Sequence, residues 1–140
     1  MRYPMINYEE VFTESFRRVL GTGAYNPEFI KCFYDTFLEK SPVVAEKFAQ
    51  TDMSAQRTML HDSLLTMVDF NRTKIPSPRL QQLAEIHSRS QHDIKPVLYD
   101  LWLESLITAV ARHDPDFDDD VSLAWRIALA PGICFMRFSY

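Results

Sequence analysis

The 140-residue sequence is short of glycine and cysteine. It contains three glycines and only two cysteines, Cys32 and Cys134. A glycine-rich phosphate loop needs more glycine than this, and a disulfide framework needs more cysteine. Each cysteine lies alone in an apolar run, which is typical of a buried free thiol in a reducing compartment. We therefore expect a cytoplasmic protein without structural disulfides or a cysteine-bound zinc ion.

The chain also lacks an excess of positive charge and a long apolar run. Its net charge is −4, with acidic and basic residues mixed, so it offers no basic stripe for nucleic acid. No run approaches the eighteen or so apolar residues that cross a bilayer, and MRYPMINYEEVF lacks the parts of a secretion signal. Length and a 46% apolar content predict one domain over 1–140, with neither nucleic acid nor membrane as a partner.

Strict alternation of apolar and polar residues, the pattern of a strand, is missing as well. Apolar residues instead recur at intervals of three and four, which predicts an all-α fold of about seven helices. Gly21 and Gly23 end the first helix, and prolines mark the starts of several others. The expected helices run over about 8–20, from Pro27, over 42–48, over 54–69, from Pro78, from Pro96 and over 121–137.

Three side chains with polar or ligating atoms interrupt the apolar faces of these helices. Tyr34 lies on the apolar face of the second helix, Gln56 begins that of the fourth, and His87 ends that of the fifth. An imidazole can bind iron, while a phenol and an amide can donate hydrogen bonds to a small ligand on that metal. By periodicity alone, an ordinary core role remains open for each of them.

The other histidines fit a metal site less well. His87 and His92 are five residues apart, which leaves them roughly 140° apart around a helix, so a zinc pair is disfavoured. His92 is expected in the connection before Pro96, facing solvent. His61 lies about 100° off the apolar face of its helix, where a solvated or rim position is expected. No spacing resembles a serine or cysteine triad.

Four segments between about 26 and 136 carry a family resemblance through their order and separation. They are FYDTFLEKSPVVAEKF, TDMSAQRTML, LAEIHSRSQHDIKPVLYDLW and AWRIALAPGICFM. Together they resemble the globins, specifically the bacterial single-domain globins and the haem domains of flavohaemoglobins. The resemblance implies a globin fold around one haem b, with His87 as the iron ligand. It also implies a wider set of haem contacts, which are Phe48, Leu60, Leu64, Leu83, His87, Tyr99 and Leu103.

The same resemblance implies a function in binding O2, NO or CO. Tyr34 and Gln56 are expected to donate hydrogen bonds to bound O2 and slow its release, which suits NO dioxygenation with an external reductase. Whether the chain is an enzyme stays open, because peroxidase-like activity in the family relies on a glutamate that MRFSY lacks.

Two alternatives of a different kind stay open. One is a haem-based gas or redox sensor, or a binding module, which an apolar outer face near Trp125 or Phe138 would indicate. The other is a regulatory globin without haem. A monomer and a homodimer are both compatible with the sequence.

Overall fold

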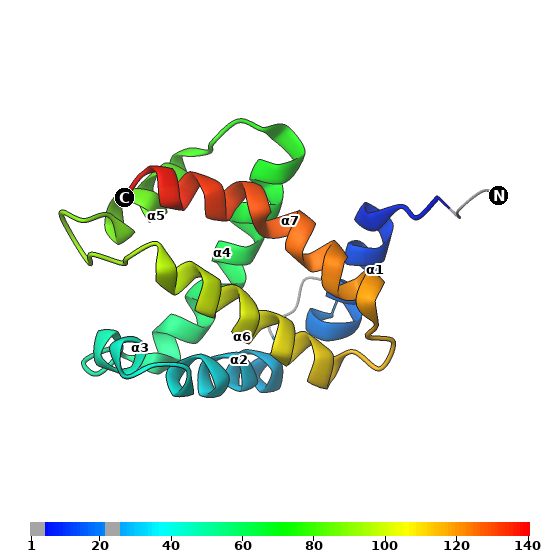
Figure 1. Ribbon diagram of the computed structural model, residues 1–140, viewed down its shortest axis with the longest axis horizontal. Helices are drawn as coiled ribbons and strands as arrows, with labels where there is room; N and C mark the ends of the chain where they lie inside the picture. The colour runs from blue at the N-terminus through cyan, green and yellow to red at the C-terminus, as the bar shows by residue number, and fades with distance from the viewer. Residues whose placement is uncertain (1–4, 22–25) are drawn as a thin grey trace.

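The computed structural model describes residues 5–21 and 26–140. These residues form seven α-helices and no strand, which confirms the predicted all-α fold (Figure 1). The helices are α1 (Tyr8–Leu20), α2 (Pro27–Glu39), α3 (Pro42–Lys47), α4 (Met53–Thr73), α5 (Pro78–His87), α6 (Val97–His113) and α7 (Asp119–Phe138).

Most helices begin where a polar side chain caps the free N–H groups of the first turn. Asn26 accepts hydrogen bonds from the backbone N–H groups of Glu28 and Phe29, and a proline follows it at the first position of α2. The same pairing of cap and proline starts α3 and α5, so the starts predicted from proline are confirmed.

The helix ends follow the predictions less closely. Gly21 ends α1 with a φ of 77°, as expected, while Gly23 lies outside the described residues. α4 continues four residues past its predicted end, to Thr73, and stops at Lys74 in the left-handed region. No glycine or proline occurs between 54 and 74, so nothing in the local sequence breaks the helix earlier.

α7 is a single helix that contains Pro131. Proline has no N–H to bond the carbonyl four residues earlier, which here belongs to Ile127. The Asn71 side chain on α4 donates hydrogen bonds to the carbonyls of Ile127 and Ala128, at 3.2 and 3.1 Å. Next to the proline, a Cβ on Gly132 would lie 2.8 Å from Cγ of Met67. α4 and α7 therefore fit together closely at this point.

A buried polar network joins α1 to the loop between α6 and α7. Ser15 donates to Asp114 at 2.6 Å, and the indole N–H of Trp125 donates to Ser15 at 2.8 Å. Arg18 adds two hydrogen bonds to the same carboxylate. Burial would raise the pKa of Asp114, but the bonds from Arg18, Ser15 and the Asp116 N–H outweigh it and lower the pKa.

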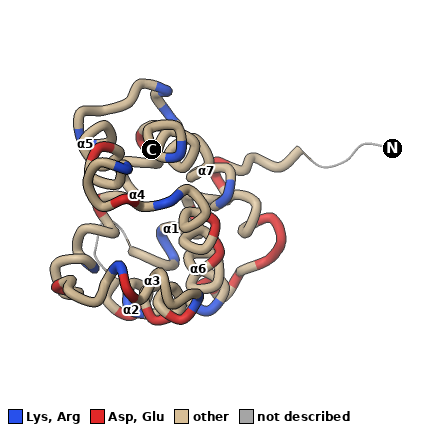
Figure 2. Tube along the Cα trace, turned by 60° about the vertical axis from the view of Figure 1, so that its left-hand side comes forward, with Lys and Arg blue, Asp and Glu red and all other residues tan. Residues whose placement is uncertain are grey.

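Acidic and basic residues are mixed over the surface, and one helix, α7, is unusually apolar. Figure 2 shows acidic and basic positions side by side over most helices, with the longest acidic stretch in the loop before α7. α7 alone among the described helices is long and apolar enough to span a membrane. Its apolar stretch has a mean hydropathy of 1.3, and 44% of that stretch is buried inside the protein. The core helix of a folded domain can be equally long and apolar. α7 is such a helix, because its Trp125 and Leu129 side chains are buried in the core.

Neither cysteine is as buried as the sequence suggested. Cys32 is half-buried and Cys134 is exposed, and both are free thiols. The expectation was wrong for Cys134 because its apolar neighbours in sequence lie partly on the outer side of α7. An apolar run on a helix does not by itself say which of its residues face the core.

Candidate functional site

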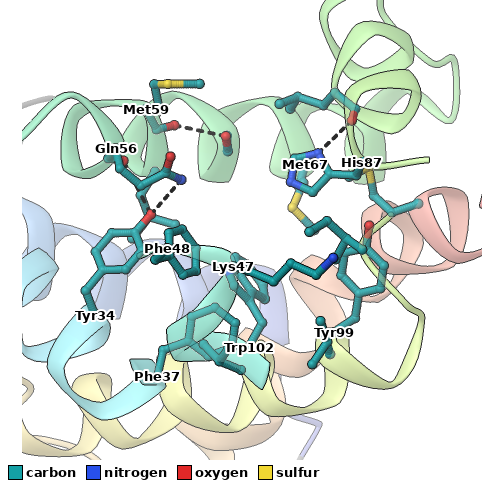
Figure 3. Close-up of a pocket in the computed structure, with 17 residues that line it drawn as sticks. Tyr34, Phe37, Lys47, Phe48, Gln56, Met59, Met67, His87, Tyr99 and Trp102 are labelled. Atoms are coloured by element: carbon teal, nitrogen blue, oxygen red, sulfur yellow. Dashed lines mark hydrogen bonds between the residues drawn. The ribbon is translucent and has the colours of Figure 1, made fainter. Parts of the chain in front are cut away.

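One pocket lies between α2, α4, α5 and α6, with α3 at its edge (Figure 3). Its cavity has a volume of about 130 Å³. Most of the lining is apolar or aromatic. The lining residues are Tyr34, Phe37, Val44, Lys47, Phe48, Gln56, Met59, Leu60, Ser63, Met67, Leu83, His87, Ile94, Leu98, Tyr99, Trp102 and Met136.

His87 is the last residue of α5 and lines this pocket. Its ring Nδ1 lies 2.8 Å from the carbonyl oxygen of Leu83, one turn earlier, as drawn in Figure 3. A carbonyl can only accept, so Nδ1 carries the proton and Nε2 of the neutral ring carries the lone pair. Burial lowers the pKa of His87, which keeps the ring neutral near pH 7. The ring is thus held in the form that binds a metal.

Tyr34 and Gln56 form a hydrogen-bonded pair at the other end of the pocket from His87 (Figure 3). The Gln56 side-chain amide donates to the Tyr34 hydroxyl at 3.1 Å, and that hydroxyl donates to the Gln56 backbone carbonyl at 3.3 Å. The ring of Phe48 meets that of Tyr34 edge-on, with the centroids 5.8 Å apart. This contact and the amide fix the position of the phenol.

Two further side chains complete the chemistry of the pocket. Burial raises the pKa of Tyr99 to about 12, so its phenol stays neutral over the physiological range. Lys47 is exposed and donates from its Nζ to the carbonyl of His92 at 3.1 Å, which joins α3 to the connection after α5. It is the one cationic side chain among the described residues that line the pocket.

The structure brings together most of the residues that the sequence pointed to. Phe48, Leu60, Leu83 and Tyr99 line the same pocket as Tyr34, Gln56 and His87. Leu64 is fully buried in the core, and Leu103 is half-buried against it, so neither lines the pocket as described.

The remaining histidines lie outside the pocket. His92 is exposed in the connection between α5 and α6, as expected. His61 does not line the pocket, and its side chain is 12% exposed, so of the solvated and rim positions that were expected, the solvated one is wrong. Its Nε2 is buried without a hydrogen-bond partner in the structure.

Sequence reasoning missed several lining residues. Trp102 lies one turn after Tyr99 on the same face of α6, and Met67 lies on the apolar face of α4, so helical periodicity could have included both. Nothing in the sequence marked Lys47, because a lone lysine beside an apolar run is common on any surface.

Comparison with known proteins identifies the family. No family model and no curated protein matches the chain. Among solved structures, the chain is similar to a protein of Pseudomonas aeruginosa PAO1, described as structurally highly homologous to a human hemoglobin. The two share 36% sequence identity and a TM-score of 0.86, over 96% of this chain and 98% of the other. The chain belongs to the globin family.

The globin fold implies haem-based gas binding, and the pocket of this globin fits a haem on three observations. His87 presents a neutral nitrogen with a free lone pair. Aromatic and aliphatic side chains form most of the walls, which suits a flat apolar ring system. Lys47 supplies a cation beside the pocket, where the carboxylates of such a cofactor need one.

Proposed function

We propose that this globin holds one haem b, with His87 as the iron ligand, and binds O2 beside Tyr34 and Gln56. The observation that carries the proposal is the opposed placement of two groups in one pocket. The neutral imidazole lies at one end and the phenol–amide pair lies at the other. A ferrous haem held there by His87 would supply an iron that binds O2, CO or NO, and bound O2 would carry partial negative charge.

Tyr34 and Gln56 would stabilise that negative charge. The hydroxyl of Tyr34 bonds the Gln56 carbonyl at the long distance of 3.3 Å, so little is lost if it turns to a ligand. The amide of Gln56 can keep its bond to the phenol oxygen and orient the O–H. A hydrogen bond to a charged group contributes about 1.5–3 kcal/mol, so O2 should leave slowly.

Slow O2 release suits NO dioxygenation better than bulk transport. O2, NO and one electron give one nitrate ion, and the atoms and charges balance. A separate reductase would supply this electron, and we propose that it acts with the globin in the cytoplasm. A tightly held O2 beside two donors in a mostly apolar pocket supports this reaction.

The test is the rate of O2 dissociation from the reduced, haem-loaded protein, followed by stopped-flow absorption. Replacing Tyr34 by Phe should raise this rate roughly tenfold or more. CO gains little charge, so its dissociation rate should change much less, and this serves as the internal control. Unchanged O2 dissociation in Tyr34→Phe would remove the phenol from ligand binding.

A further inference from the structure

α7 departs from the ordinary rules of helix formation where it packs against α4. Pro131 and Gly132 follow one another inside this 20-residue helix, and they are the two residue types that favour a helix interior least. The Asn71 side chain offsets part of the effect of the proline, because it donates to two carbonyls about one turn earlier. A hydrogen bond does not explain Gly132, because what distinguishes glycine is its missing side chain.

The missing side chain of Gly132 makes room for Met67 on α4. A Cβ on residue 132 would lie 2.8 Å from Cγ of Met67 and 2.9 Å from both its Cβ and its Cε. Favourable contacts between carbon atoms lie at about 3.5–4.0 Å, so all three would be repulsive. The Cβ of Met67 is fixed to the backbone, so turning the methionine side chain cannot relieve every contact. A larger residue at position 132 therefore displaces Met67, and α4 with it.

Met67 also lines the pocket, which connects this part of α7 to the candidate haem site. Its side chain is buried and lies at the His87 end of the pocket in Figure 3. Met136, one turn after Gly132 on the same side of α7, lines the pocket as well. Gly132 is not itself among the lining residues, so it reaches the site through Met67.

A methionine suits this end of the pocket. Its side chain is flexible and polarisable, so it fills irregular space and packs favourably against aromatic rings. The imidazole of His87 and a haem are both flat aromatic groups. Met67 held firmly by α7 would form part of the wall that keeps them in place.

We propose that Gly132 is a positioning residue for the haem site, because it lets α7 approach α4 closely and so holds Met67 at the His87 end of the pocket. A close approach of two backbones is a common use of glycine. Residues that break a local rule of folding are also expected at functional sites. The effect of Gly132 on haem rests on the proposed function, whereas its effect on Met67 does not.

Methyl NMR tests the position of Met67, in the haem-free protein and in the ferrous–CO form. Gly132→Ala should shift the Met67 methyl resonance, because the side chain moves relative to the ring of His87. Met67→Leu identifies this resonance by removing it. The resonance of Met59, which lies at the Gln56 end of the pocket, should stay unchanged. An unchanged Met67 resonance in Gly132→Ala would overturn the proposal.

The rate of haem loss to apomyoglobin tests the consequence for the site. Gly132→Ala should raise this rate about fivefold or more, since crowding a packed interior has an effect of that size. Val121→Ala is the matched control, because Val121 is buried on α7 but does not line the pocket. It should lower the overall stability through the cavity it leaves, with little change in haem loss. Equal acceleration in both variants would overturn the proposal, because it indicates general destabilisation.

A double substitution tests the contact itself. Met67→Ala removes Cγ and Cε, two of the three atoms that a Cβ on residue 132 would crowd. Gly132→Ala should therefore speed haem loss less in a Met67→Ala background than in wild type, and equal effects would overturn the proposal. If Gly132→Ala alone does not fold, a folded double variant supports the contact and an unfolded one overturns it. A wild-type protein that retains no haem would overturn the proposed function instead, and the NMR of the haem-free protein would still decide the role of Gly132.

Discussion

At the scale of single residues, one hydrogen bond decides what His87 can do. The bond from Nδ1 to the Leu83 carbonyl fixes the tautomer and leaves Nε2 with the lone pair. The acceptor is a carbonyl and not a carboxylate, in keeping with the missing glutamate in MRFSY. In the proposed haem site, His87 would thus offer a neutral imidazole with no added negative charge, which favours reversible gas binding over peroxidase chemistry.

The lowered pKa of His87 predicts how pH affects the haem-free protein. Burial holds this pKa below the ordinary 6.5, so below pH 6.5 the unfolded chain binds more protons at this residue than the folded protein. The free energy of unfolding should therefore fall as pH decreases below about 6.5. Urea unfolding at pH 7.5 and 5.5 measures this change. The free energy of unfolding should fall less between the two pH values in His87→Leu than in wild type. Equal losses would contradict the account.

Lys47 predicts a small effect on haem retention. An exposed ion pair contributes about 0.2–1 kcal/mol, so Lys47→Gln should speed haem loss to apomyoglobin by about 1.4- to fivefold. Lys40→Gln is a suitable control, because Lys40 is exposed but does not line the pocket. The effect should shrink at high salt. A salt-independent change would indicate that the bond to the His92 carbonyl matters instead of charge.

The pocket could be predicted from sequence only in part. Tyr34, Gln56 and His87 were found because each breaks an apolar face with a polar group, and the family resemblance raised them above core residues. The bond between Tyr34 and Gln56 joins residues 22 apart and depends on how α2 meets α4, which local periodicity does not contain. Leu64 and Leu103 face the interior as predicted. Helical periodicity does not distinguish an interior residue that packs in the core from one that lines the pocket.

At the scale of helices, starts were easier to predict than ends. Asn26–Pro27, Ser41–Pro42 and Ser77–Pro78 combine a cap with a proline, and each starts a helix. The end of α4 has no such local signal. Its last turn contacts α7 through Asn71, a tertiary interaction that sequence patterns around residue 71 do not show.

The contact between Asn71 and α7 predicts an energetic coupling with Pro131. Asn71→Ala should lower the free energy of unfolding by about 1 kcal/mol, because the Ile127 carbonyl then loses its donor. In a Pro131→Ala background, the new backbone N–H of residue 131 can donate to the Ile127 carbonyl. Asn71→Ala should then lower the free energy of unfolding by less than it does in wild type. Urea unfolding of the four proteins measures the coupling. Equal costs in the two backgrounds would show that Asn71 does not compensate for the proline.

At the scale of the whole molecule, the order of the elements identified the fold, while the surface of α7 escaped prediction. The order of Phe48, Gln56 and His87 along the chain carried the resemblance to globins, and a structure 36% identical over most of the chain confirms it. The outer side of α7 carries the exposed side chains of Leu123, Ile127 and Phe138, which are as apolar as the residues on its core side. The sequence therefore could not separate the two faces.

The central claim is that His87 binds the iron of a gas-binding haem. Absorption spectra of the reduced protein, purified with added haem, test it most directly when recorded with and without CO for wild type and His87→Ala. Wild type should show a haem Soret band that shifts on adding CO, and His87→Ala should fail to retain haem. A His87→Ala protein that keeps the wild-type ferrous–CO spectrum would contradict the account.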